Sequence, residues 1–458
     1  MTRKFKKPDY EEVLKQTISL EEALPANHLA RFVVDVIAQL DLAPIYAQYA
    51  PTGGEPMAPE ILLGLLFYGY ANGAFSSRKI EKATYESIPF RYIASGMHPD
   101  HDTIANFRKT FLAEIQELFV QILLLAQVAE VLKLGNISLD GSKVHADASK
   151  SKAVSYRRLG KLETQLRQEV KELFELGEQA DQGELQLPEG LLIEDEIARR
   201  KQRLVNLAEA KAVIEARAQE RHEAEQAEYE AKQREREEKS RKTGRKPRGP
   251  KPKPPEPGPQ DKDQYNFTDP ASRIMKNSSN DGFDQHYNVQ VAVDQESFLV
   301  VANGLSNHPN DKQEAEPTLD AIDPRLGKPP AAAMDNGYFS ITNITACEER
   351  FIEPFIATGK EAHYLNLETL LAKLPEAPAE EASPREKMAY KLQTEAGHTI
   401  YRLRKCTVEP VIGIIKEVIG FRQFSLRGLL AAAGEWCLVC LAFNLKRLHS
   451  LFQAQGLL

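Results

Sequence analysis

Near its C-terminus the chain reads Tyr401-Arg-Leu-Arg-Lys-Cys-Thr-Val-Glu409-Pro-Val-Ile-Gly-Ile-Ile-Lys416. After Pro410 the apolar residues recur with helical spacing, which predicts a helix. Proline fits a first helical turn and disfavours helical geometry in the residue before it, so Glu409 is expected at, or just before, the helix start. Glu409 and Lys416 then lie about two turns apart on one face. A carboxylate framed by basic residues and a tyrosine suits a phosphodiester site; a solvated amphipathic helix with an ion pair is the alternative.

The composition is that of an ordinary soluble protein. Its 458 residues have room for about two to four domains, and 42% of them are hydrophobic. The net charge of −7 excludes a globally basic protein, so any nucleic-acid surface must be local. Four cysteines argue against a disulfide framework and suit a reducing cytoplasm. The N-terminus lacks the apolar core of a secretory signal, and the most apolar long stretch, 119–132, is too short to span a membrane.

Residues 1–132 are predicted to form a helical domain. Asn27 is expected to cap a first amphipathic helix. Ser76 is expected to cap a short helix, and His101 to open a long one. Short helices with basic residues at their starts suit a helix-turn-helix type of DNA reader, and a plain helical bundle is the alternative.

The pattern changes in residues 133–154, which are predicted to supply the first strand of an α/β domain. Residues 136–147 alternate apolar and polar side chains, as a strand does. Asp140 lies in the middle of this strand and precedes a glycine, so its backbone can approach another group closely. An Asp-Gly turn is the alternative.

Two segments then interrupt this domain. Residues 155–242 are rich in charged helix formers and carry two leucine-rich stripes, which predicts a helical hairpin or short coiled coil. Residues 243–264 are basic and proline-rich, as in a linker. Within them Arg248-Gly-Pro resembles, weakly, the arms that lay arginine in a minor groove.

Residues 265–458 are predicted to complete the α/β domain. A β-hairpin covers 286–305, and strands then alternate with helices, which favours a mixed sheet with helices on both faces. Asp335 ends a buried strand, where such sheets present their sites; a capping Asp-Asn-Gly turn is the alternative. Cys437 and Cys440 lie on an apolar helix without a second ligand pair, so we interpret them as core residues rather than zinc ligands.

Three carboxylates stand out, on a strand, a strand end and a helix start: Asp140, Asp335 and Glu409. Oxygen ligands without thiolates suit Mg²⁺ or Mn²⁺, and two such ions can activate a water or a 3′-hydroxyl and stabilise a leaving oxygen. Basic and tyrosine side chains are predicted to bind the flanking DNA phosphates: Tyr401, Arg404, Lys405, Lys416, Arg273, Lys276 and Arg427.

With these motifs the sequence resembles the bacterial insertion-sequence transposases of the DDE type, over nearly the whole chain. Leu139-Asp140-Gly-Ser-Lys-Val-His is similar to the segment with the family's first catalytic aspartate, and Met334-Asp335-Asn-Gly-Tyr-Phe to the segment with the second. Val408-Glu409-Pro-Val-Ile-Gly-Ile-Ile-Lys416 resembles the glutamate block. Further similar segments are Thr103-Ile-Ala-Asn-Phe-Arg, Tyr287-Asn-Val-Gln-Val-Ala-Val-Asp294 and Phe424-Ser-Leu-Arg-Gly.

The resemblance implies an RNase H-like catalytic core, with Asp140, Asp335 and Glu409 as catalytic metal ligands for two Mg²⁺ ions. It implies binding of double-stranded DNA at terminal inverted repeats and in the target, hydrolytic nicking at element ends, and strand transfer by the freed 3′-hydroxyl. We expect a homodimer in the DNA complex and a bacterial cytoplasmic protein, nucleoid-associated when bound, with no membrane partner. The rival hypotheses are a metal-dependent nuclease that cuts without joining and a catalytically inactive DNA-binding derivative.

The sequence departs from the family pattern in two places. The family spacing Tyr-x2-Arg-x3-Glu-x6-Lys puts Arg404 one residue too far from Glu409, so Lys405 is a candidate for the arginine's role. The large helical insertion lies between Asp140 and the hairpin at Tyr287, whereas many relatives carry theirs between the second aspartate and the glutamate. A role in dimerisation or in DNA contact fits this insertion equally well.

Overall fold

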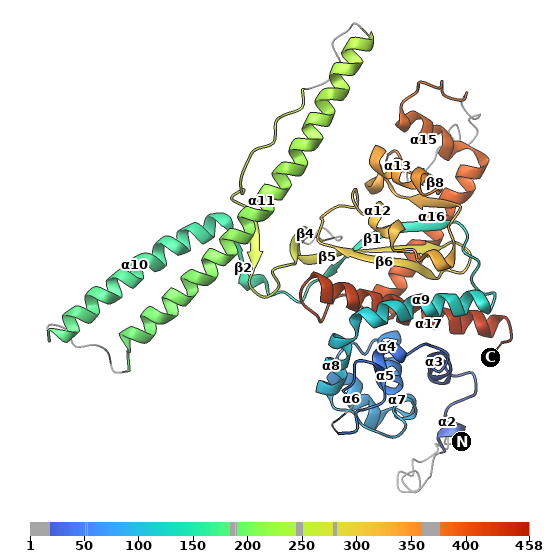
Figure 1. The fold of residues 1–458 in the computed structure, drawn as a ribbon, viewed down its shortest axis with the longest axis horizontal. Helices are drawn as coiled ribbons and strands as arrows, with labels where there is room; N and C mark the ends of the chain where they lie inside the picture. Colours follow the sequence, from blue (N-terminus) through green and yellow to red (C-terminus); the bar gives the residue numbers. More distant parts are fainter. Residues whose placement is uncertain are drawn as a thin grey trace, which may run out of the picture. The chain divides into compact units, whose positions relative to one another are not determined.

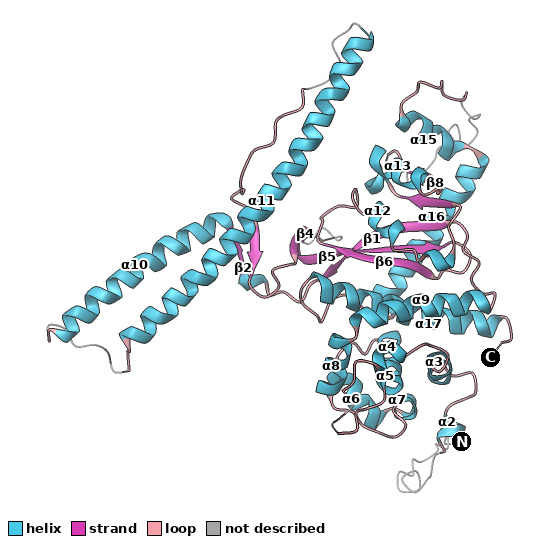
Figure 2. Cartoon of the chain, in the orientation of Figure 1, coloured by secondary structure: helices cyan, strands magenta, loops and turns pink. Residues whose placement is uncertain are grey.

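The computed structural model describes residues 19–50, 52, 54–183, 188, 190–243, 251–277, 282–359 and 376–457 (Figure 1). The chain divides into two compact units, one made of Met1–Asp147 with His286–Leu458 and the other of Ala148–Gln285. Figure 2 shows that the first unit combines a sheet with many helices, whereas the second is mainly two long helices. The expectation of an α/β fold with a mixed sheet is confirmed.

Short helices form the N-terminal part of the first unit: α2 (Leu20–Ala23), α3 (Leu29–Ile37), α4 (Ala43–Tyr46), α5 (Pro59–Ala71), α6 (Ser77–Glu86), α7 (Ile88–Ile93), α8 (His101–Thr110) and α9 (Leu112–Val128). The cap of α3 is His28, whose ring accepts from the amide of Ala30, so the expectation of an Asn27 cap is wrong. Ser76 is the N-cap of α6 without a side-chain capping hydrogen bond. The long helix expected from His101 is bent by 75° between α8 and α9.

The main sheet has six strands, in the order β4-β5-β1-β7-β8, with β6 paired to β5; all of them except β4 and the start of β5 belong to the first unit. Their bounds are β1 (Ile137–His145), β4 (Arg273–Lys276), β5 (Phe283–Asp294), β6 (Val300–Ser306), β7 (Ala331–Met334) and β8 (Glu353–Ile356). β5 runs antiparallel to both β1 and β6, whereas β1, β7 and β8 run parallel to one another. β6 therefore runs in the direction of β1, and the carboxyl ends of β1, β6 and β7 meet at one edge.

Helices pack on this sheet at several places. α16 (Glu395–Gly413) crosses β1 and β7, and α17 (Leu429–Ala454) packs on β6 and runs beside α9 (Figure 1). α12 (Ala315–Asp320) packs on β6, while α13 (Ile341–Glu349) and α15 (Pro384–Gln393) pack on β8. By composition and length α17 could cross a membrane, but most of it is buried inside the protein, as a core helix is. Cys437 and Cys440 belong to this buried helix and are free thiols, as core residues.

The second unit is built on a helical hairpin. α10 (Tyr156–Asp181) and α11 (Ile193–Thr243) pack through a small apolar core of Leu159, Leu166, Leu207, Ala210 and Ile214. At its base β2 (Ala153–Ser155) pairs with β3 (Gln264–Asn266). The described part of the proline-rich segment, from Lys251, runs beside the second half of α11 (Figure 1), where Asp263 pairs with Arg221 at 2.9 Å. The Arg248-Gly-Pro segment lies outside the described residues.

Candidate active site

Asp140 lies in the middle of β1, opposite Val291 of β5, and not in an Asp-Gly turn. Because side chains alternate along a strand, Asp140 shares one face of β1 with Ser138 and Ser142, and α16 covers this face. Oδ1 of Asp140 accepts from the amide of Gly141 at 2.9 Å. The side chain is 18% exposed, so its carboxylate is largely removed from water.

Asp335 follows β7 directly, at the carboxyl end of the strand, as expected. Its Oδ1 accepts from the amide of Gly337 at 2.7 Å and so caps a short helical turn, η3 (Asn336–Tyr338). The sequence offered two alternatives for Asp335, a strand end and a capping Asp-Asn-Gly turn. The structure shows both, because the residue that ends β7 also caps the turn. The turn therefore uses at least one carboxylate oxygen of Asp335.

Glu409 lies inside α16 and not at its start, so the expected helix boundary is wrong. The helix begins after the Thr394 cap and continues through Pro410 to Gly413, where a π-turn follows (Ile414–Val418). A proline in a helix interior costs about 3 kcal/mol. The buried face of α16 on β1 and β7, with Val408, Val411 and Ile412, compensates for this cost. Glu409 lies outside this buried face, with its side chain 50% exposed.

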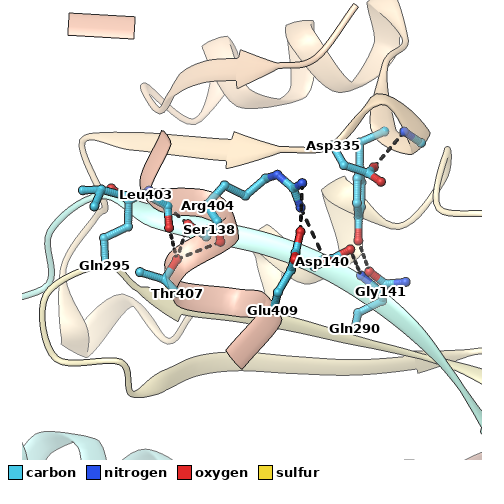
Figure 3. Close-up of polar contacts among 12 residues, drawn as sticks. Ser138, Asp140, Gly141, Gln290, Gln295, Asp335, Leu403, Arg404, Thr407 and Glu409 are labelled. Carbon is cyan, nitrogen blue, oxygen red and sulfur yellow. Dashed lines mark hydrogen bonds and ion pairs between the residues drawn. The ribbon is translucent and has the colours of Figure 1, made fainter. Parts of the chain in front are cut away.

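Arg404 lies between two of the three acids (Figure 3). Its Nη1 is 3.5 Å from Oδ2 of Asp140, and its Nη2 is 3.3 Å from Oε1 of Glu409. The guanidinium is 7% exposed, whereas Lys405 is on the exposed face of α16. The structure thus brings Arg404 to the carboxylates of Asp140 and Glu409, despite the spacing that departs from the family pattern. Tyr401 is next to it, with its ring centre 5.8 Å from the Arg404 guanidinium carbon.

The other predicted phosphate ligands lie at different places. Lys416 donates to Oγ of Ser142 and to the carbonyl of Lys143, at 2.8 Å for the latter, so its ammonium fastens the turn after α16 to β1. Burial lowers the pKa of Lys416. Arg427 donates to Asp147 at 2.8 Å. Arg273 and Lys276 belong to β4, and Nη1 of Arg273 donates to the carbonyl of Ala271 at 2.9 Å.

Sequence analysis missed a further acid, Asp311, which follows β6. Its Oδ1 accepts from Nδ2 of Asn288 at 2.8 Å and from Nε2 of Gln290 at 2.7 Å. Gln290 in turn accepts from the hydroxyl of Tyr338, in the turn that Asp335 caps. Only the sheet topology could have identified Asp311. It follows β6, which runs parallel to β1 and therefore ends at the same edge of the sheet.

Gly141 makes room for this network. It faces the side of β1 opposite to Asp140, together with Gln290. A Cβ at Gly141 would lie 2.4 Å from both Oδ1 of Asp311 and Nε2 of Gln290. A Cβ at Gly337 would lie 2.9 Å from Asp335 Oδ1 and 3.5 Å from Asp311 Oδ2. Two of the acids thus approach one point beside Gly337.

The acids influence one another's ionisation. Burial raises the pKa of Asp140 to about 7; Asp335 and Asp311 add to this shift, and Arg404 opposes it. Burial also raises the pKa of Asp335, with Asp311 adding to the shift and Arg404 opposing it. Carboxylates that resist ionising side by side are stabilised by a divalent cation.

The donor chemistry fits Mg²⁺ or Mn²⁺, because the acids of this site, Asp140, Asp335 and Glu409, offer carboxylate oxygens. Within the described ranges, no three acid, histidine or cysteine side chains are already arranged around one metal position. The Arg404 guanidinium pairs with Asp140 and Glu409 instead. The residues present therefore fit a metal site by type and neighbourhood.

Two family comparisons agree with this geometry. Residues 18–110 match the family described as Transposase domain (DUF772), and residues 256–445 match the Transposase DDE domain. Together these domains define a DNA transposase. The chain thus carries two transposase domains, a combination consistent with an insertion-sequence DDE transposase. No match was found among curated proteins or among solved structures.

The family match gives the site its general chemistry. A DDE domain supports an enzyme of the nuclease and transposase class that acts on DNA, and the family generally uses divalent metal ions. The matched segment includes Asp311, Asp335 and Glu409 but begins after Asp140. The place of Asp140 in the site thus rests on the geometry alone.

Proposed function

We propose that this protein nicks DNA at the terminal inverted repeats of an insertion sequence and joins the freed 3′-hydroxyl to target DNA. The observation that carries this proposal is the convergence of Asp140, Arg404 and Glu409, with Asp335 electrostatically coupled to Asp140. These groups come from two neighbouring parallel strands and the helix that crosses both.

An RNase H-like core is part of the proposal. Three antiparallel strands, β6, β5 and β1, continue into the parallel strands β7 and β8, and the first and second acids lie on adjacent strands. This order is the one that the DDE family implies. We further propose that the helical residues 1–132 bind DNA, while 133–154 and 265–458 form the core around the 155–242 hairpin and the 243–264 linker.

In the proposed mechanism Asp140, Asp335 and Glu409 bind two Mg²⁺ ions. When bound, these ions activate a water or a 3′-hydroxyl and stabilise the leaving oxygen. Arg404 provides the counter-charge within the site, where it pairs with Asp140 and Glu409, and is a candidate to bind a phosphate. Lys416 positions α16 on β1, and Tyr401, Lys405, Arg427, Arg273 and Lys276 are candidates for binding phosphates along the DNA.

The partners follow from the reaction. Two element ends must be brought together, so we propose a homodimer in the DNA complex, acting in the bacterial cytoplasm on the nucleoid. Sedimentation of the paired-end complex would test this: one protein chain per pair of ends would contradict it.

The function is tested with labelled DNA carrying the element's ends, incubated with Mg²⁺ and either wild-type protein or Glu409→Gln. The substitution preserves size and removes a charge that the metals need. We expect wild type to nick and join, and the variant to bind DNA without doing either. The control is Glu417→Gln. Glu417 lies about two turns after Glu409, is exposed and pairs with Arg422, so its substitution should leave both nicking and joining intact.

Each rival hypothesis predicts a different result. Nicked ends without joined products would identify a nuclease of the same core. Binding without any Mg²⁺-dependent cutting by wild type would identify a DNA-binding derivative. Full activity of Glu409→Gln would show that Glu409 is not a metal ligand.

A further inference from the structure

The base of the helical hairpin carries a run of basic residues without an intervening acid. Residues 148–162 contain five basic residues and no acidic one, in a chain whose net charge is −7. The segment covers the turn η1 (Lys150–Lys152), the strand β2 and the start of α10. Positive charge is therefore concentrated where the hairpin begins.

Most of these cations are exposed and lack an acidic partner. Lys152, Arg157, Arg158 and Lys161 make no ion pair with any residue that the structure describes, whereas Lys150 pairs with Asp284. Further along the hairpin, cations pair with nearby acids: Arg167 with Glu163, Lys171 with Glu175, Arg199 with Glu196, and Arg200 with Glu169. The cations at the base of the hairpin therefore lack the acidic partners that neutralise the cations further along its two helices.

Helix geometry turns three of these cations away from the hairpin core. At about 100° per residue, Arg157 and Lys161 lie opposite Leu159 and Leu166, which are buried against α11. Arg158 lies on the adjoining flank. The amino end of this long helix, capped by Ser155, adds its own partial positive charge to the same place.

A groove of about 400 Å³ lies next to one of these cations, Lys152. Its lining includes Lys152, Arg203, Asn206 and Phe267. Two cations, an amide and a ring that is 36% exposed are the groups that proteins use along a nucleic-acid backbone. The rest of the groove lining is largely apolar, with Val154, Leu162 and Leu207.

We propose that this arm-base surface, made of Lys152, Arg157, Arg158, Lys161 and Arg203, binds the phosphate backbone of duplex DNA. The inference rests on the proposed function, since the family match supplies the polyanion that the surface fits. It gives the hairpin a role in DNA contact. Because the surface offers charges and no base-reading helix, its binding is independent of sequence.

The test compares two full-length variants with equal charge changes. Arg157→Ala/Arg158→Ala/Lys161→Ala removes three cations at the base. The control, Arg167→Ala/Lys171→Ala/Arg199→Ala, removes three paired cations from the same two helices. Alanine maintains helical propensity in both variants. Affinity for a labelled duplex of arbitrary sequence is measured by fluorescence anisotropy over a range of salt concentrations, in EDTA.

We expect the base variant to weaken binding at low salt by roughly tenfold or more, and to reduce the slope of log affinity against log salt by about 2 to 3. The control should retain the wild-type slope. Equal losses of affinity in both variants, or no loss in the base variant, would overturn the proposal. No loss in the base variant would leave an acidic protein as the partner that this surface fits. A single Arg157→Glu variant provides the same readout if the triple variant unfolds.

EDTA separates this test from that of the proposed function, because no cutting is needed to read the slope. Failure of the three-acid site leaves the comparison of slopes intact. A wild-type protein that binds no duplex at all would overturn both proposals.

Discussion

At the scale of single residues, the fold changes the ionisation of Asp140 strongly. Burial raises its pKa from 3.8 to about 7, with Asp335 and Asp311 adding to the shift and Arg404 opposing it. Between these two pH values the folded protein binds a proton that the unfolded chain has released. We therefore expect the stability of the metal-free protein to fall as pH rises from about 4 to 7.

The measurement is thermal melting in EDTA across this pH range, for wild type and Asp140→Asn. The variant has no titrating group at position 140, so its melting temperature should depend less on pH than that of wild type. Conversely, Mn²⁺ affinity of wild type should rise with pH through about 7, because a ligand must be deprotonated to bind metal. A parallel pH dependence of melting in both proteins would contradict the assignment.

Gly141 yields a second prediction at this scale. In Gly141→Ala the new methyl group would overlap the Asp311 carboxylate and the Gln290 amide at 2.4 Å. We expect a loss of about 1–3 kcal/mol in the free energy of unfolding, as overpacking costs, together with weaker Mn²⁺ binding as Asp311 moves. Gly160→Ala is the control: nothing lies within 4 Å of its Cβ, so in helix α10 it should gain up to about 1 kcal/mol.

At the scale of elements, the seating of α16 on β1 determines where Arg404 and Glu409 stand. The hydroxyl of Thr407 lies 2.8 Å from Oγ of Ser138, and Nε2 of Gln295 donates to the same Oγ at 3.0 Å (Figure 3). All three residues are buried. They join the helix that carries Glu409 to the strand that carries Asp140.

Thr407→Val removes this link and preserves the shape of the side chain. We expect a loss of about 1–3 kcal/mol in stability, because Ser138 remains buried with one partner fewer. We also expect kcat for nicking to fall while the KM for DNA stays unchanged. Thr399→Val is the control, since its hydroxyl bonds only within the exposed part of the same helix. Equal effects of the two substitutions on kcat would argue against a positioning role.

The elements also show which parts of the site the sequence could predict. Asp140 in a strand and Asp335 at a strand end follow from local alternation, and both were found from the pattern. The predicted start of α16 at Glu409 was wrong. Pro410 disfavours a helix interior locally, but the packing of α16 across two strands outweighs this preference. Asp311 was missed because its place depends on the direction in which β6 runs, which only the sheet topology provides.

At the scale of the whole molecule, the N-terminal helices are tied to the C-terminal helix of the same unit through one buried acid. Glu435 of α17 is fully buried and accepts from the Tyr70 hydroxyl of α5 at 2.9 Å and from the amide of Ser425 at 2.8 Å. Arg108 of α8 lies 3.8 Å away. The helices matched to the transposase domain thus share a core with the end of the DDE domain.

Removing this charge should therefore destabilise the unit as a whole. In Glu435→Gln the buried guanidinium of Arg108 loses its counter-charge, and we expect a loss of about 3–5 kcal/mol. Urea unfolding followed by tryptophan fluorescence measures it, because the chain's single tryptophan, Trp436, is buried next to Glu435 in this unit. Glu86→Gln, which breaks an exposed pair with Lys82, should cost no more than about 1 kcal/mol. If both substitutions cost the same, the two matched domains are held together by apolar packing, and the buried acid contributes no more than a surface charge.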